Sequence, residues 1–146
     1  MKRMYLITVL ILLFFSIKTF GQPIHQDSCK VIKIEVYKYE YLITAVNLSI
    51  NDTILIVSEK HKIKEKENLI SVDSTYLFCL MPLIDLAKVS AMPPNSFRLR
   101  TKDKRILWTS GQDIKLIPFK ASNLKGLILL SASSECLYPQ NRRSVL

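Results

Sequence analysis

The sequence predicts an all-β domain, mainly antiparallel, that forms a small sandwich or barrel with at most one short helix near residues 82–91. Three observations support this class. After the first 21 residues, Ile, Val and Thr far outnumber Ala, and β-branched side chains suit a pleated strand better than a helix. Apolar and polar residues alternate in several segments, which is the period of a strand. Turn-forming residues recur at the spacing of hairpins.

Residues 1–21 have the layout of a secretory signal peptide. A cationic start precedes 14 uncharged residues over 4–17, and small residues Thr19 and Gly21 stand before Gln22. A membrane-spanning helix needs roughly 20 apolar residues, which this run does not reach. We expect cleavage between Gly21 and Gln22, export to the periplasm or the exterior of a bacterium, and no transmembrane segment after cleavage.

The first strand segment is expected to be long. Apolar residues occupy even positions at Ile32, Ile34 and Val36, and the same phase returns at Leu42 and beyond. The middle of the segment has no Gly, Pro, Asn or Asp to form a turn. These features favour one strand over 31–50, bent or bulged near Tyr39, over two separate strands.

Two turns are predicted in the next part of the chain. Asn51 and Asp52 tolerate positive φ and predict a hairpin into a strand over 53–58. The charged segment 59–68 is expected to be a solvated loop or a frayed helical turn. Asp73 and Ser74 predict a second hairpin, which joins strands over 69–72 and 76–81.

The later elements are shorter. Residues 82–91 form either a short helix or an irregular crossover. A hairpin is expected over 97–109, and then a strand over 114–119, which Pro118 assigns to a sheet edge. Residues 127–131 are the last expected strand. The folded domain is therefore 22–138, and 139–146 is a flexible C-terminal tail.

The order of these elements is similar to that of the OB fold. The long bent first strand and a helix-sized insert after the third strand carry the likeness. No sequence motif accompanies it. The fold class thus includes an OB-like barrel as one form of the expected small β domain.

Three cysteines lie in the part of the chain expected to be exported, where disulfides form. Cys29 begins the first strand and Cys136 follows the last, and such ends often lie close in small β domains. A disulfide between Cys29 and Cys136 is therefore predicted. Cys79 lies in an apolar strand centre and is expected to be a buried, inert thiol.

The strongest charge feature is a run of five bases with one acid over 98–105. It predicts a basic binding patch for a polyanion such as an anionic glycan or a lipid headgroup, and the export signal argues against nucleic acid. The alternative is that the arginines form the solvated face of a strand that buries Phe97 and Leu99. The patch residues are Arg98, Arg100, Lys102, Lys104 and Arg105.

No motif points to catalysis, a cofactor or a metal. Only 3 Gly occur, which leaves no Gly-rich phosphate loop, and there is no metal-binding His or Cys motif and no Gly-x-Ser-x-Gly. His25 and His61 are expected to be solvated. We therefore expect an exported, non-catalytic binding or envelope-associated structural module, whose partner is an envelope protein or an anionic glycan or lipid headgroup.

Two alternatives stay open. One is a small periplasmic hydrolase whose acidic or basic residues converge only in the fold. The other is a polyanion-binding or inhibitor-type domain that uses a loop such as 91–96, which two prolines stiffen.

Overall fold

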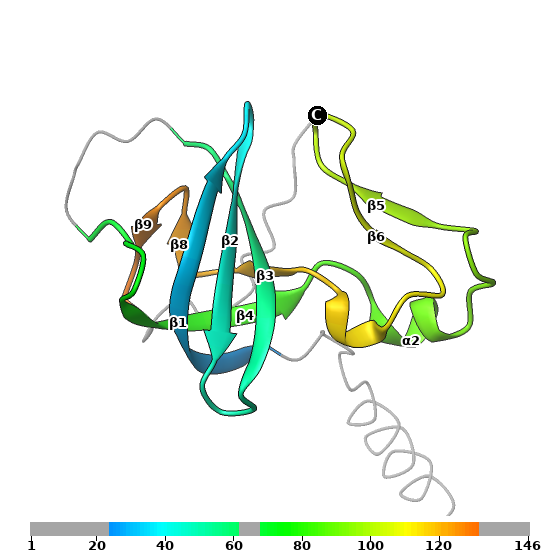
Figure 1. The fold of residues 1–146 in the computed structure, drawn as a ribbon, viewed down its shortest axis with the longest axis horizontal. Coiled ribbons are helices and arrows are strands. Elements are labelled where there is room, and N and C mark those ends of the chain that lie inside the picture. Colours follow the sequence, from blue (N-terminus) through cyan, green and yellow to red (C-terminus); the bar gives the residue numbers. More distant parts are fainter. Residues whose placement is uncertain (1–23, 62–67, 132–146) are drawn as a thin grey trace, which may run out of the picture.

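The computed structural model describes residues 24–61 and 68–131, and this part of the chain is mostly β (Figure 1). Five strands close into a barrel. In chain order they are β1 His25–Val36, β2 Glu40–Asn47, β3 Asp52–Glu59, β4 Thr75–Pro82 and β7 Phe119–Ala121. The predicted β-rich fold is confirmed, and its form is a barrel.

The barrel is mixed because one of its strand pairs is parallel. The strand order is β1-β2-β3-β7-β4, and β4 returns to pair with β1. All neighbours are antiparallel except β3 and β7, which run parallel where Ile56 meets Phe119. A parallel pair needs a long connection. Here the chain passes through β4 and a large excursion before it enters β7.

The single long strand expected over 31–50 is wrong. The chain turns back between Val36 and Glu40, where the Tyr37 N–H donates to the Glu40 carbonyl at 2.9 Å. The even phase was misleading because the register shifts between Val31 and Lys33, a β-bulge that reverses which side chains face inward. As a result Ile32 is 46% exposed while Val31 is buried.

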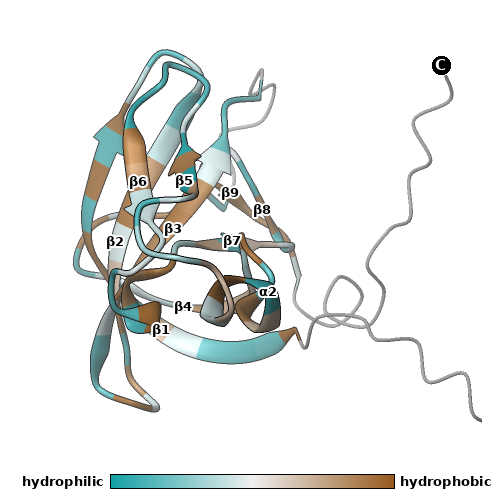
Figure 2. Ribbon diagram, turned by 90° about the vertical axis from the view of Figure 1, so that its right-hand side faces the viewer, coloured by the Kyte–Doolittle hydropathy of each residue, from teal (hydrophilic) through white to brown (hydrophobic). Residues whose placement is uncertain are grey.

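The barrel interior holds one apolar core. Apolar and polar stretches alternate along the strands (Figure 2). In β2 the inward residues are Ile43 and Ala45, not the even-numbered set that the pattern indicated, and Ile50 in the following turn is exposed. The buried members of the core are Cys29, Val31, Ile43, Ala45, Ile54, Ile56, Ile70, Phe78, Leu80, Ala121 and Leu124.

Residues 83–118, which we call the insert, leave the barrel between β4 and β7. The insert contains α2 Leu86–Ser90, β5 Arg98–Arg100, β6 Ile106–Thr109 and the short 3-10 helix η1 Ile114–Leu116. The expected short helix and the expected hairpin are both present. The helix begins later than Pro82, which is the last residue of β4, because the Asp85 carboxylate caps it by accepting the Ala87 N–H at 3.1 Å.

The strand expected over 114–119 is wrong. Asp113 accepts the Lys115 N–H at 3.0 Å and starts η1, so the chain is helical there and becomes extended only afterwards. The Pro118 carbonyl accepts the Leu83 N–H at 2.9 Å, which ties the two ends of the insert together. The strand that closes the barrel is β7.

The remaining segments also differ from the prediction. The segment 127–131 contains only β9 Ile128–Leu129, which pairs with β8 Leu124–Lys125. Residues 69–72 do not form a hairpin strand: Leu69 makes an isolated bridge to Ile128, and β4 pairs with β1 and β7. The turn at Asp73 does form, with a positive φ of 65°.

The hairpin predicted at Asn51 and Asp52 is confirmed. Asn51 has a φ of 53°, and β2 and β3 pair antiparallel along their full lengths. Three predictions concern residues outside the described part of the chain: the signal peptide 1–21 with cleavage between Gly21 and Gln22, the pairing of Cys136, and the tail 139–146.

Candidate functional site

The insert lies beside β3 and covers the outer face of β2 and β3 (Figures 1 and 2). It has a small core of its own, in which Val89, Trp108 and Ile117 are buried and Leu99 packs against them. The Trp108 indole N–H donates to the Asp113 carbonyl at 3.2 Å. The insert is therefore a separately packed layer on the barrel.

The tip of the β5–β6 hairpin is fixed to the barrel through two glutamates. Glu40 and Glu59 face each other across β2 and β3. Glu40 is only 5% exposed and accepts the Lys102 backbone N–H at 3.2 Å. The Lys102 ammonium pairs with Glu59, also at 3.2 Å. The carboxylates of Glu40 and Glu59 thus both bind Lys102, one through its backbone N–H and the other through its ammonium.

A second contact joins the hairpin to the β1–β2 turn. The Arg105 guanidinium lies over the Tyr37 ring, 3.9 Å from its centroid, and donates to the Tyr37 hydroxyl. That hydroxyl donates to Glu35 at 3.0 Å, and Lys33 pairs with the same carboxylate at 3.2 Å. These partners, the Tyr37 hydroxyl first, lower the pKa of Glu35.

Tyrosines and cations alternate at this end of the barrel. Besides Arg105 on Tyr37, the Lys38 ammonium lies 5.0 Å from the Tyr39 ring centroid and the Lys60 ammonium lies 5.3 Å from that of Tyr41. Lys60 also donates its backbone N–H to the Tyr39 carbonyl at 2.9 Å. We call the end made by residues 37–39, 59–60 and 98–105 the basic rim.

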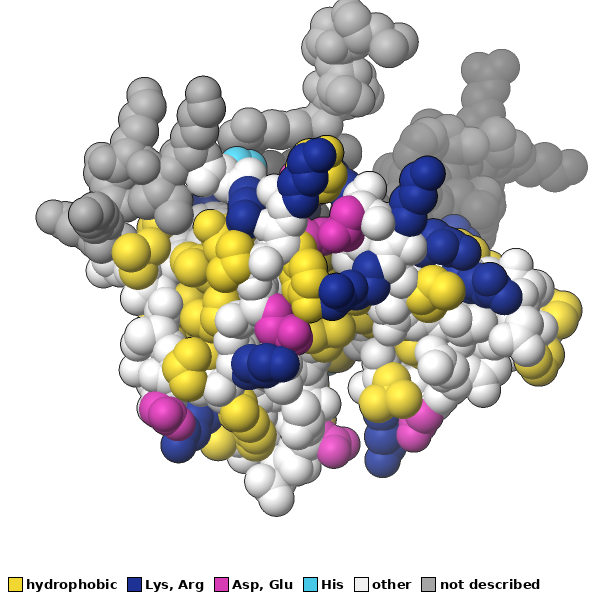
Figure 3. All heavy atoms as spheres, turned by 45° about the horizontal axis from the view of Figure 1, so that its top comes forward, with side chains coloured by type: hydrophobic (Ala, Val, Ile, Leu, Met, Phe, Trp, Pro, Cys, Tyr) yellow, Lys and Arg dark blue, Asp and Glu magenta, His cyan; other side chains and the backbone are white. Residues whose placement is uncertain are grey.

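The structure divides the predicted basic patch into two groups. Lys102 and Arg105 are occupied in anchoring the hairpin, as described above. Arg98, Arg100 and Lys104 are exposed and make no ion pair with another described residue. Viewed from this end, Lys and Arg side chains lie across the surface with fewer acidic side chains among them (Figure 3).

The alternative interpretation of the arginine strand, as the solvated face of a strand, holds in part. Leu99 does pack toward the insert core while Arg98 and Arg100 point to solvent, and Phe97 is 36% exposed. The sequence analysis missed Tyr37, Tyr39 and the two anchoring glutamates. The Tyr-Lys-Tyr triplet over 37–39 was a usable signal for the aromatic residues, whereas the glutamates show their role only through contacts distant in sequence.

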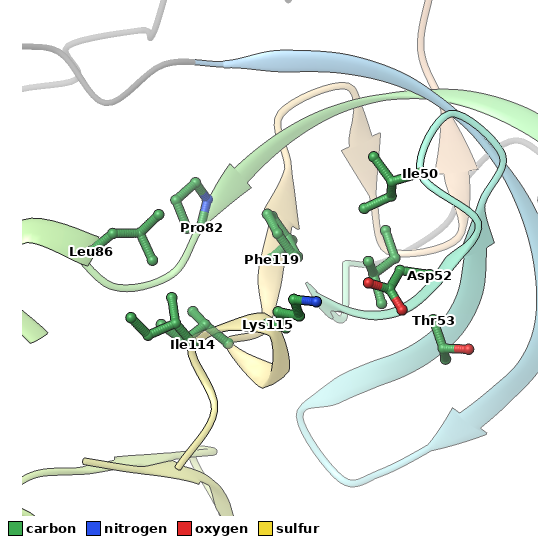
Figure 4. A pocket seen from close by; sticks show the side chains of 10 residues that line it. Ile50, Asp52, Thr53, Pro82, Leu86, Ile114, Lys115 and Phe119 are labelled. Carbon is green, nitrogen blue, oxygen red and sulfur yellow. The ribbon is translucent and has the colours of Figure 1, made fainter. Parts of the chain in front are cut away.

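A different kind of site lies at the opposite end of β2 and β3. It is an apolar groove of about 450 Å³ between the β2–β3 turn, the end of β4 and the two short helices of the insert (Figure 4). Seven of its ten lining residues are apolar, and they come from three segments of the chain, within 50–54, 82–86 and 114–119. The lining residues are Ile50, Asp52, Thr53, Ile54, Pro82, Leu86, Ile114, Lys115, Ile117 and Phe119.

The predicted disulfide between Cys29 and Cys136 is wrong at Cys29, which is a free, buried cysteine. Cys29 and Val31, which precede the bulge, both face the barrel core. Burial, and then the nearby Asp27 carboxylate, raise the pKa of the Cys29 thiol to about 12. Cys79, expected to be a free thiol, is disulfide-bonded. Cys136 lies outside the described residues.

Across 24–61 and 68–131, no group of three His, Cys, Asp or Glu side chains could hold a metal ion. In the same part of the chain no helix has the length and apolar character to cross a membrane. No protein-family model, curated protein or solved structure matches the chain.

Proposed function

We propose that the chain is an exported, non-catalytic binding module with an OB-like barrel, and that its basic rim binds an anionic glycan. The observation that carries this proposal is the state of the cations on the β5–β6 hairpin. Arg98, Arg100 and Lys104 have no ion-pair partner among the described residues, and they sit on a hairpin that Lys102 and Arg105 hold against the barrel.

The strand order supports the OB-like assignment. The barrel has five strands in the order β1-β2-β3-β7-β4, and a parallel β3–β7 pair closes it. OB folds bind oligonucleotides and oligosaccharides on the face of their second and third strands and on the loops that adjoin it. In this chain the β1–β2 turn and the insert, which joins the fourth and fifth barrel strands, meet at that face.

The spacing of the free cations suits a chain that carries repeated charges. Arg98 and Arg100 are alternate residues of one strand, so they share a side and lie about 7 Å apart along it. Lys104 extends the row to the hairpin tip. Because the anchoring contacts already order the hairpin, a bound chain would not have to supply that ordering, which favours affinity.

The acidic residues at the rim and beside it each have a partner. Within the rim, Glu59 pairs with Lys102 and Asp103 accepts the Thr101 hydroxyl. Beside the rim, Glu35 is held by Lys33 and the Tyr37 hydroxyl. The lowered pKa of Glu35 keeps that contact in place in mildly acidic solution. The signal-peptide layout of residues 1–21 supports a glycan of the cell envelope, because nucleic acid is scarce outside the cytoplasm.

Retention on a column of sulfated glycan tests the proposal. The double variant Arg98→Ala/Arg100→Ala should elute at distinctly lower salt than the wild type, because each lost contact reduces the salt dependence of binding by up to about 1 unit of log K per log salt. Lys88→Ala/Lys125→Ala removes the same charge away from the rim and should elute close to the wild type.

Equal elution of the two double variants would show that retention follows net charge alone and would overturn the glycan site. Sedimentation with vesicles that contain anionic lipid separates the two polyanion classes. If the rim variant loses vesicle binding and keeps glycan binding, the ligand is a membrane surface and the glycan proposal fails.

A further inference from the structure

The apolar groove is separate from the basic rim. Its residues lie at the β2–β3 turn, whereas Glu40 and Glu59 mark the other ends of the same two strands. Its volume of about 450 Å³ falls within the range of small-molecule sites, roughly 300–1,000 Å³. The groove therefore has the size to hold a metabolite, whatever the rim binds.

One end of the groove is apolar and open to solvent. Leu86 from α2 and Ile114 from η1 are 44% and 46% exposed, and they lie together with Pro82 at this end (Figure 4). The ring of Phe119 lies between them and the rest of the groove. Exposed apolar side chains are common singly, but a cluster from several segments around one hollow indicates a binding site.

The other end of the groove carries two opposite charges. The Asp52 carboxylate lies here near Thr53, and the Lys115 ammonium points toward it from the middle of the groove (Figure 4). Neither Asp52 nor Lys115 forms an ion pair with another described residue. The groove can therefore offer a ligand one negative group, Asp52, and one positive group, Lys115, at this end.

We infer that the groove binds a free α-amino acid with a large apolar or aromatic side chain. An α-amino acid carries its ammonium and its carboxylate on one carbon, so both reach the charged end together. The ammonium would meet Asp52 and the carboxylate Lys115, while the side chain extends past Phe119 toward Leu86 and Ile114. A fatty acid would satisfy Lys115 but leave its carboxylate beside Asp52, and a longer peptide carries its two terminal charges far apart.

Titration calorimetry with phenylalanine and two analogues of it tests this inference. Phenylpropionate lacks the amino group and phenethylamine lacks the carboxylate. Each should bind the purified protein at least tenfold more weakly than phenylalanine. Asp52→Asn should abolish the preference for phenylalanine over phenylpropionate, and Lys115→Met should abolish the preference over phenethylamine. Lys125→Met, an exposed lysine on β8, should leave all three affinities unchanged.

Two results would overturn the inference. Equal binding of the three compounds, or preferences that survive both substitutions, would make the groove a general apolar surface. Absence of binding by phenylalanine, tryptophan and leucine alike would remove the ligand class. Circular dichroism of each variant confirms that the barrel is intact. Because no groove residue belongs to the rim, these failures would leave the glycan proposal standing.

Discussion

The barrel and the insert differ in how much apolar material holds each together. Among the described residues, the barrel core holds eleven buried side chains, and the barrel closes on itself through strand pairing. The insert core holds three in the same part of the chain, Trp108 among them, beside a two-stranded ribbon. Local stability follows buried apolar contacts, so we expect the barrel to be the rigid platform and the insert the more adjustable layer. Both proposed sites lie where the two meet.

The largest effect is expected from the barrel core. Phe78 is completely buried, and Phe78→Ala should lower the free energy of unfolding by about 3–5 kcal/mol, because it removes a ring and leaves a cavity. Denaturant unfolding followed by circular dichroism measures this loss. Leu77→Ala on the same strand is the control, since Leu77 is 42% exposed, and it should cost less than about 1 kcal/mol. Similar costs at the two positions would contradict the core as described.

A smaller and more local effect is expected from the insert core. Trp108→Ala should speed amide exchange over residues 83–118 on the order of 100-fold, while amides in β1 to β4 keep their protection. Hydrogen exchange measured by mass spectrometry resolves the two regions. Phe97→Ala, at a half-exposed position of the insert, should change exchange by less than about tenfold. A uniform loss of protection after Trp108→Ala would mean that barrel and insert unfold as one unit.

The sequence predicted the class of this fold better than its pairings. Alternation and the Asn51–Asp52 turn gave the β-rich class and the β2–β3 hairpin, because those signals are local. The bulge after Val31 could not be found in this way, since a one-residue shift in register is set by the partner strand. Cys29 lies inside the barrel as a free cysteine, so the pairing that the chain ends alone suggested does not form.

In the candidate sites, too, local features could be predicted from the sequence and features that depend on distant contacts could not. The basic run over 98–105 is contiguous, so the sequence alone could reveal it. The sequence could not reveal which of its cations anchor the hairpin and which have no ion-pair partner. The groove joins residues from 50–54, 82–86 and 114–119, three segments that are far apart in the chain. The apolar residues are ordinary within each segment, and only the packing of the barrel against the insert brings the segments together.

The last prediction concerns pH and the barrel core. The folded protein keeps the Cys29 proton up to a pKa of about 12, whereas the ordinary thiol value is 9.0. Above pH 9 the unfolded chain therefore binds fewer protons than the folded one, so stability falls as pH rises toward 12. Below pH 9 the buried Cys29 thiol makes its full contribution to the free energy of unfolding. Its loss should be at most about 1.4 kcal/mol for each pH unit above that.

Urea unfolding of wild type and Cys29→Ala between pH 8 and pH 10.5 measures this contribution. Lysine and tyrosine residues titrate in both proteins, so only the difference between the two curves reports on the thiol. The wild type should lose stability more steeply than the variant, and hydrogen exchange should place the extra loss in the barrel strands and not in the insert. Parallel curves would mean that the Cys29 thiol ionises as freely in the folded barrel as in the unfolded chain. That result would contradict the complete burial of Cys29 in the core.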